Sequence, residues 1–218
     1  MDIFERISKD AGGPLGQYWD KAQGYFMFPK LEGELGPHMR FQGQEVLCWS
    51  LNNYLGLANH PEIRKVDAEA AARWGLAYPM GSRMLTGHTS LHERFERELA
   101  DFEKKEDAFL FNFGYQGIVS TIQSLLTRAD VVVHDKEAHA CLIDGCMLAN
   151  KAERLSYRHN DIKHFEKVIR HALEITEKTG GGILVITEGV YGMTGALGNL
   201  DELVQMKEKY PFRIMIDD

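Results

Sequence analysis

The chain has 218 residues, of which 44% are hydrophobic and 26% are charged, and its formal net charge is −7. It is too apolar and too evenly mixed in charge to be disordered, and it is long enough to bury one sizeable core. Lys and Arg alternate with Asp and Glu and form no long basic run, so we expect no nucleic-acid partner.

The start of the chain is acidic, and its apolar stretches are short. Residues 1–5 lack the basic and then apolar order of a secretory signal. The longest apolar stretches, such as residues 182–187, are far too short to cross a bilayer. We therefore expect a cytoplasmic protein with no transmembrane segment.

The cysteines and histidines lack the spacing of a metal site. Cys48, Cys141 and Cys146 form no C-x-x-C pair, which predicts buried free thiols and not a disulfide framework. The histidines at positions 60, 88 and 92 are not compactly spaced, so we expect no metal.

The first part of the chain predicts a separate N-terminal element over residues 1–60. Residues 4–25 have the pattern of a helical arm, interrupted by Gly12, Gly13 and Pro14. Residues 39–41 and 45–47 flank a glycine-containing turn, as the strands of a short hairpin do. Helical periodicity follows from about residue 61 to residue 101, with an irregular interruption over residues 78–88.

Residues 61–218 predict one α/β domain. Helix-length amphipathic segments separate short apolar runs at residues 108–111, 131–134, 155–157, 183–187 and 214–216. This alternation predicts a mostly parallel sheet with helices on both faces. Ligands bind such sheets beyond the carboxyl ends of the strands, so we look for chemistry directly after each run.

Three residues in these positions have a chemical and a plain interpretation. Gly114 precedes a helix and could admit a phosphate to backbone amides, or it could only serve the turn. His139 could stack on a flat cofactor, or it could be a solvated residue at a helix start. Asp217 could keep a pyridinium nitrogen protonated, or it could be a turn or capping aspartate. We interpret residues 158–161 as a solvated loop without chemistry.

A series of short motifs, in order, covers most of the chain. They are Asn52-Asn53-Tyr54-Leu55-Gly56-Leu57, Gly81-Ser82-Arg83, Thr86-Gly87 with His92, Phe113-Gly114-Tyr115, His139, Thr187-Glu188-Gly189-Val190-Tyr191 and Asp217-Asp218. Together they resemble the α-oxoamine synthases, a family of acyltransferases that depend on pyridoxal 5′-phosphate (PLP) and include 8-amino-7-oxononanoate synthase and serine palmitoyltransferase.

The resemblance implies a PLP-dependent transferase of fold type I that works as a homodimer, with its active site at the subunit interface. Gly114 and Tyr115 would hold the cofactor phosphate through backbone amides. His139 would stack on the cofactor ring, and Asp217 would pair with the ring nitrogen.

The resemblance also implies a decarboxylative condensation of an amino acid with an acyl group delivered by CoA or an acyl carrier protein. Asn52 would help to bind a substrate carboxylate, Ser82 would lie near the dimer-shared site, and Glu188 would lie close to the reacting centre. The family's cofactor lysine follows the aspartate by a few tens of residues. We therefore expect this chain to be an incomplete, inactive part of a longer enzyme, without the small C-terminal domain.

Two features bear on the substrate and leave alternatives open. Residues 25–33 resemble the arm of serine palmitoyltransferase-like members, which favours a long-chain acyl donor and a lipid product. Gly192 stands where the family often has a serine near the cofactor. The alternatives are an aminotransferase or lyase of the same fold type, or a catalytically silent subunit of a serine palmitoyltransferase-like complex.

Overall fold

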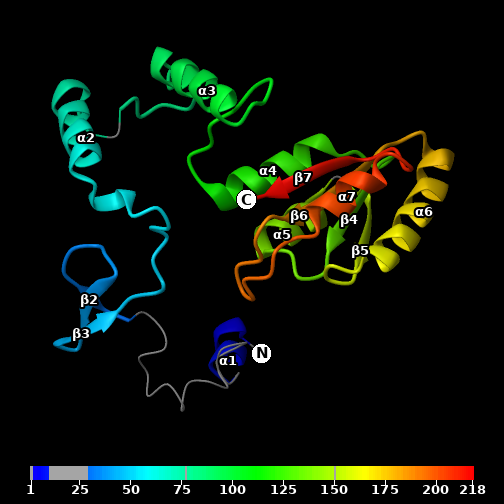
Figure 1. The fold of residues 1–218 in the computed structure, drawn as a ribbon, viewed down its shortest axis with the longest axis horizontal. Coiled ribbons are helices and arrows are strands. Elements are labelled where there is room, and N and C mark those ends of the chain that lie inside the picture. Colours follow the sequence, from blue (N-terminus) through cyan, green and yellow to red (C-terminus); the bar gives the residue numbers. More distant parts are fainter. Residues whose placement is uncertain (1, 10–28, 77, 150) are drawn as a thin grey trace. The chain divides into compact units, whose positions relative to one another are not determined.

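The computed structural model describes residues 2–9, 29–76, 78–149 and 151–218 (Figure 1). The chain forms two compact units, Met1–Ser90 and Leu91–Asp218. The boundary at residue 60 expected from the sequence stays a prediction.

The first unit carries short helices and a small antiparallel sheet in the order β1-β2-β3. Its elements are α1 (Ile3–Lys9), β1 (Leu31–Glu32), β2 (His38–Phe41), β3 (Gln44–Leu47), the 3₁₀ helix η2 (Leu57–Asn59) and α2 (Pro61–Trp74). Most of the predicted helical arm lies outside the described residues. Pro61 opens α2, where its fixed φ suits the first helical turn and its missing N–H costs nothing.

The predicted hairpin is confirmed as β2 and β3. Phe41 pairs with Gln44, so only Gln42 and Gly43 form the turn between the strands. Both turn residues have positive φ, 50° and 77°, as tight hairpin turns require. The glycine therefore serves the backbone conformation of this turn.

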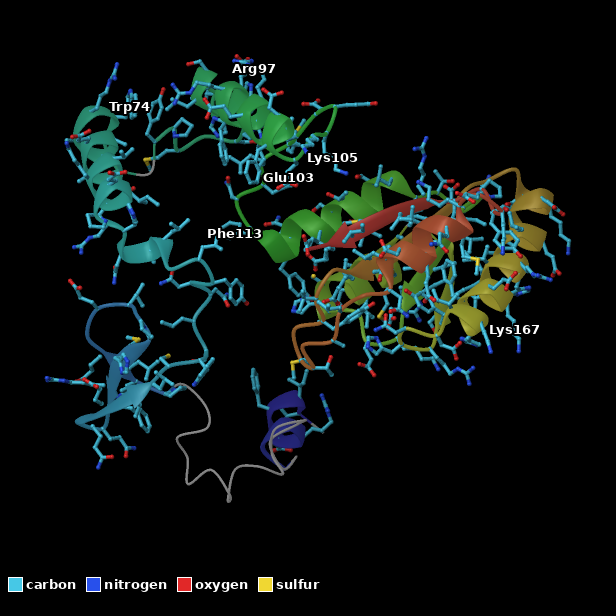
Figure 2. All side chains as sticks on the ribbon, viewed as in Figure 1. Trp74, Arg97, Glu103, Lys105, Phe113 and Lys167 are labelled. Carbon is cyan, nitrogen blue, oxygen red and sulfur yellow. The ribbon has the colours of Figure 1, made fainter. Side chains whose placement is uncertain are left out.

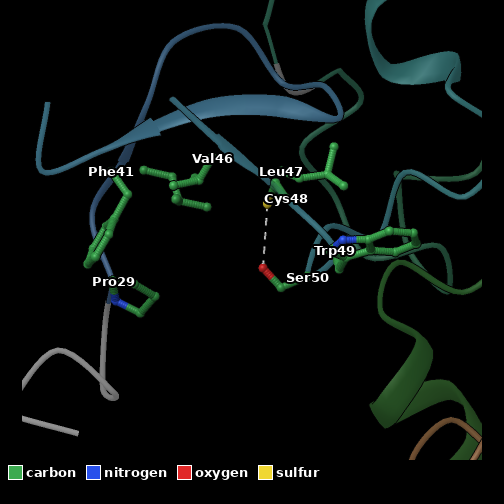
Figure 3. A pocket seen from close by; sticks show the side chains of 8 residues that line it. Pro29, Phe41, Val46, Leu47, Cys48, Trp49 and Ser50 are labelled. Carbon is green, nitrogen blue, oxygen red and sulfur yellow. Dashed lines mark hydrogen bonds between the residues drawn. The ribbon is translucent and has the colours of Figure 1, made fainter. Parts of the chain in front are cut away.

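An apolar pocket of about 320 Å³ lies on the hairpin (Figure 3). Its lining residues are Pro29, Leu31, Phe41, Val46, Leu47, Cys48, Trp49 and Ser50. Among them, the Cys48 thiol lies 3.6 Å from the Ser50 hydroxyl. None of the site residues predicted from the sequence lines this pocket.

The second unit is an α/β layer structure. Its elements are α3 (Ser90–Phe102), α4 (Gly114–Leu125), β4 (Val131–Asp135), α5 (Ala140–Leu148), β5 (Glu153–Tyr157), α6 (Ile162–Thr179), β6 (Ile183–Glu188), α7 (Leu200–Met206) and β7 (Arg213–Asp217). The four strands are all parallel in the order β5-β4-β6-β7. Four of the five predicted strands are confirmed.

Helices cover both faces of this sheet, as the sequence predicts. Val132 packs with Ile122 of α4 and Leu142 of α5 on one face. Val131 and Val133 point the other way and pack in the cluster that contains Phe165 and Ile169 of α6 and Leu203 of α7. Because side chains alternate along a strand, this run of three valines contributes to both cores.

Cys141 and Cys146 lie in the first core, the one that contains Val132, as free thiols. Figure 2 shows Lys167 on the outer, exposed side of α6.

The predicted strand at residues 108–111 is wrong. The structure forms no strand over this segment, and the Leu110 N–H donates to Glu96 Oε1 of α3 over 2.7 Å. Phe109 and Phe111 remain exposed, with ring centroids 5.0 Å apart. An apolar run forms a strand only where its backbone groups meet a ladder partner.

None of the helices in the described ranges is long and apolar enough to cross a lipid bilayer. The cytoplasmic location stays a prediction.

The turn between α6 and β6 offers a test of close backbone packing. A Cβ added at Gly181 would lie 1.9 Å from the Ala129 carbonyl oxygen, whereas at Gly182 the nearest atom would be 3.8 Å away. We expect Gly181→Ala to lower the free energy of unfolding by about 1–3 kcal/mol, because backbone must move. Gly182→Ala is the matched control and should leave the free energy of unfolding unchanged or raise it slightly. Urea unfolding measures both, and equal effects would contradict this packing.

Candidate functional site

The sheet changes winding direction between β4 and β6. From β4 the chain passes through α5 to β5 on one side, then returns through α6 to β6 on the other side of β4. The helices α5 and α6 therefore lie on opposite faces, and their connections diverge at the carboxyl ends of β4 and β6. In open α/β sheets this switch point is where ligands bind.

His139 lies at this edge as the N-cap of α5. Its ring nitrogen Nδ1 accepts a hydrogen bond from the Cys141 backbone N–H at 3.3 Å. Its own backbone N–H donates to Glu188 Oε1 at 2.5 Å. The end of β6 is thereby tied to the start of α5, while the His139 ring itself stays exposed.

Glu188 is a buried carboxyl at the end of β6, with only 6% of its surface exposed. Burial raises the pKa of Glu188, and the neighbouring charges of Asp217 and Asp135 act in the same direction. The hydrogen bond from His139 opposes that rise. The site therefore favours a protonated Glu188 more than water does.

The N-terminus of α4 lies beside that of α5. The Tyr115 hydroxyl donates to Asp144 of α5, and this bond raises the pKa of Tyr115. The Tyr115 ring meets the His139 ring edge-on, with centroids 6.4 Å apart. Phe113 precedes the helix at the point labelled in Figure 2 and gives it no side-chain cap.

Free backbone donors open into space at the start of α4. The first helical bond is that of the Gly117 N–H to the Phe113 carbonyl, at 2.9 Å. Among the described residues, the N–H groups of Gly114 and Tyr115 have no acceptor. A Cβ added at Gly114 would meet nothing within 4 Å. A helix start with open N–H groups and a positive dipole end suits an anion.

Asp217 ends β7 directly beside Glu188, its partner in the strand register. Its carboxylate is half-buried and makes no hydrogen bond or ion pair with any other described residue. Its backbone carbonyl accepts from the Gly189 N–H at 2.8 Å, which fixes the strand end. Asp217 is thus a positioned carboxylate with free acceptor capacity.

The structure therefore brings together five of the seven site residues predicted from the sequence. The connected set is Gly114, Tyr115, His139, Glu188 and Asp217. Asn52 and Ser82 belong to the first unit, and their roles stay predictions. Asn52 is exposed and accepts from the Tyr54 hydroxyl at 3.5 Å.

Ser82 lies in a tight turn of the first unit. Its carbonyl accepts from the N–H groups of Leu85 and Gly87, both at 2.9 Å. A Cβ at Gly87 would lie 1.8 Å from the Gly81 carbonyl oxygen, so glycine is required where the two backbone segments cross. The turn presents the Ser82 side chain to the outside.

Sequence reasoning missed a network around Asp135. This carboxylate is fully buried at the end of β4 and accepts from the Asn160 N–H at 3.1 Å, with His159 Nδ1 at 3.1 Å. The Asn160 amide continues to the Leu197 carbonyl at 2.9 Å. The interpretation of residues 158–161 as a solvated loop is wrong for His159 and Asn160, because a buried carboxylate must be hydrogen-bonded. The sequence signal for this network was an aspartate, Asp135, directly after an apolar strand.

In the parts of the chain that the structure describes, no three His, Cys, Asp or Glu side chains are grouped to hold a metal ion.

The pKa of Glu188 generates a prediction about stability. Because its pKa in the folded state is raised above the ordinary 4.5, its contribution to stability is lost as the pH rises through the folded pKa. Glu188→Gln should therefore gain stability relative to the unmodified protein over the pH range that begins at about 4.5 and extends upward. Urea unfolding across this range measures the difference.

Glu166 provides a control of opposite sign. Its hydrogen bonds from Tyr210 and Arg170 lower its pKa below 4.5, so its contribution is lost as the pH falls. Glu166→Gln should lose stability relative to the unmodified protein as the pH rises from acid values. A Glu188→Gln difference that follows the same direction would refute the raised pKa.

Comparison with known proteins gives a consistent assignment. The model of the family aminotransferase class I and II matches residues 44–218. The chain is 58% identical over 217 residues to a cysteate-C-fatty acyltransferase of Capnocytophaga ochracea, covering 100% of this chain and 51% of that protein. It is 36% identical over 198 residues to an 8-amino-7-oxononanoate synthase of Thermoanaerobacter pseudethanolicus. That match covers 91% of this chain and 49% of that protein.

Solved structures agree. A serine palmitoyltransferase from S. paucimobilis, with a bound PLP–myriocin aldimine, matches with a TM-score of 0.86 and 26% identity over 100% of this chain and 53% of that chain. The serine palmitoyltransferase of Sphingomonas wittichii matches with a TM-score of 0.85 and 26% identity, again over 100% of this chain and 53% of that chain. The chain spans about half the length of the relatives it matches. It belongs to the aminotransferase class I and II family and, within it, to the α-oxoamine synthases.

Proposed function

We propose that the protein containing this chain is a PLP-dependent C-acyltransferase that condenses an amino acid with an acyl thioester and releases carbon dioxide. The observation that carries the proposal is the convergence of three groups at one sheet edge. These are the open N–H groups of α4, the exposed His139 ring and the free carboxylate of Asp217.

Each of these groups fits one part of PLP. The amides of Gly114 and Tyr115 suit the phosphate, because they offer donors at a positive helix end. The exposed imidazole of His139 suits the flat face of the ring. The carboxylate of Asp217 suits a protonated ring nitrogen, since it would supply the opposite charge that keeps the proton there. When bound, PLP would draw electrons from the α-carbon of an amino acid.

Glu188 serves this site as a positioning residue in our proposal. Its buried carboxylate accepts from the His139 backbone N–H, so it sets where α5 begins and where the imidazole stands. The network of Asp135, His159 and Asn160 fixes the other side of the same edge. When residues behind the site hold the ligand-contacting residues in place, the site keeps its geometry as a ligand binds.

We further propose cysteate as the amino acid and a fatty acyl thioester as the acyl donor. The support is the 58% identity to a protein named cysteate-C-fatty acyltransferase. This agrees with the long-chain acyl donor and lipid product expected from residues 25–33. We also propose a homodimer, supported by the family resemblance and by large exposed apolar side chains in the second unit, such as Phe109, Phe113 and Met193.

The reaction can be tested with the full-length protein, PLP and a fatty acyl-CoA. We expect cysteate to cause release of free CoA and carbon dioxide, and Asp217→Asn to slow this release by at least about 100-fold, because the developing negative charge would lose its electron sink. Serine and alanine in place of cysteate test the amino acid. Oxo-acid formation without CoA release would instead indicate an aminotransferase, and no reaction with bound PLP would indicate a silent subunit.

The phosphate position can be tested separately at Gly114. A Cβ there meets no protein atom within 4 Å, so Gly114→Ala should keep the stability of the fold. The same methyl group would obstruct an anion approaching the helix amides, and we expect about tenfold or greater loss of PLP affinity. Pyridoxal, which lacks the phosphate, is the control ligand and should lose much less. An equal loss for both ligands would place the phosphate elsewhere.

A further inference from the structure

A second side chain touches the His139 ring from within the core. The Cys141 sulfur lies 2.9 Å from His139 Nδ1, the same atom that accepts the Cys141 backbone N–H. Cys141 is only 2% exposed and packs with Ile122 and Leu142 in the core between the sheet and the helices α4 and α5. The contact is therefore sealed from solvent on the sulfur side.

The surroundings of Cys141 keep it a protonated thiol, which can donate. Burial raises the pKa of the thiol, and the charges of Asp217 and Glu188 add to the rise. A His139 Nδ1 that faces two donors, the thiol and the Cys141 N–H, must offer its lone pair. The hydrogen-bond network thus assigns the proton of the neutral imidazole to Nε2, on the exposed side of the ring.

We propose that Cys141 is a positioning residue of the candidate active site, whose thiol holds the His139 ring in its Nε2–H form and in one orientation. This inference rests on the proposed function, in which the His139 ring contacts the cofactor. Without the thiol, the backbone N–H alone would hold Nδ1, over the longer distance of 3.3 Å. The ring would then be free to turn and to exchange its proton between the two nitrogens.

The chain offers a matched control in Cys146. It lies on the same helix, is also 2% exposed and belongs to the same core, and burial raises its pKa to about 11. In the described part of the chain its thiol has no hydrogen-bond partner. Cys146→Ala therefore removes a thiol from the same core without touching His139. Cys141→Ser is the rescue variant, because its hydroxyl can also donate to Nδ1.

The direct test is the imidazole ¹⁵N spectrum of the full-length protein without cofactor, with the His139 signals identified by their loss in His139→Phe. We expect the Nε2–H form in the unmodified protein, in Cys146→Ala and in Cys141→Ser. Cys141→Ala should show a mixture of both forms. A proton on Nδ1 in the unmodified protein, or an unchanged spectrum in Cys141→Ala, would overturn the proposal.

Cofactor binding gives a second readout. Cys141→Ala should weaken PLP binding by about two- to tenfold, the range expected for one hydrogen bond, and Cys141→Ser should restore it. Loss of binding in Cys146→Ala to the same extent would show a packing effect and contradict the proposal. If no variant binds PLP, the proposed function fails, while the spectra of the cofactor-free protein still decide the role of Cys141.

Discussion

The hydrogen bond between the His139 backbone N–H and the buried carboxyl of Glu188 is the link on which the arrangement of the candidate site depends. It joins the end of a central strand to the start of a helix that the chain reaches from the neighbouring strand. Glu188 is also the partner of Asp217 in the backbone register of β6 and β7, so His139 and Asp217 are both positioned relative to Glu188, one by its carboxyl and the other by its backbone. Removing the carboxyl would release the start of α5 from the end of β6, while the backbone pairing of β6 and β7 would still hold Asp217 beside position 188.

The burial of Glu188 has an energetic cost, and the fold compensates it only in part. One backbone N–H donates to its carboxyl, while two further acidic residues, Asp135 and Asp217, lie near enough to raise its pKa. Three carboxyl groups at one sheet edge disfavour the fully ionised state. A cationic group bound at this edge would relieve that repulsion, which is a physical reason for a protonated pyridine ring to bind here.

The sequence predicted the layers of the fold well because their signal is local. The three valines of β4 and the apolar run of β6 can be predicted as strands from residue type alone, and they form the buried centre of the sheet. Residues 108–111 have the same local signal, but Leu110 bonds to Glu96 and no strand forms. Whether a partner strand exists is not a local property.

The site was predictable as a set of residue types but not as a set of contacts. His139 and Asp217 follow predicted strands and match family motifs, so both were found. The bond from His139 to Glu188 joins residues 49 positions apart, and that from His159 to Asp135 joins residues 24 positions apart. Contacts between residues so far apart leave no periodic pattern in the sequence from which they could be predicted. The Cys141 thiol was correctly expected to be buried, but its direction toward His139 required coordinates.

The central claim is that one sheet edge holds PLP through the start of α4, the ring of His139 and the carboxylate of Asp217. A crystal structure of the full-length protein with PLP tests it most directly. The account predicts the phosphate within hydrogen-bond distance of the Gly114 and Tyr115 amides, the cofactor ring against the His139 imidazole, and the ring nitrogen paired with Asp217. A cofactor bound away from this edge, or bound with its phosphate away from α4, would contradict the account.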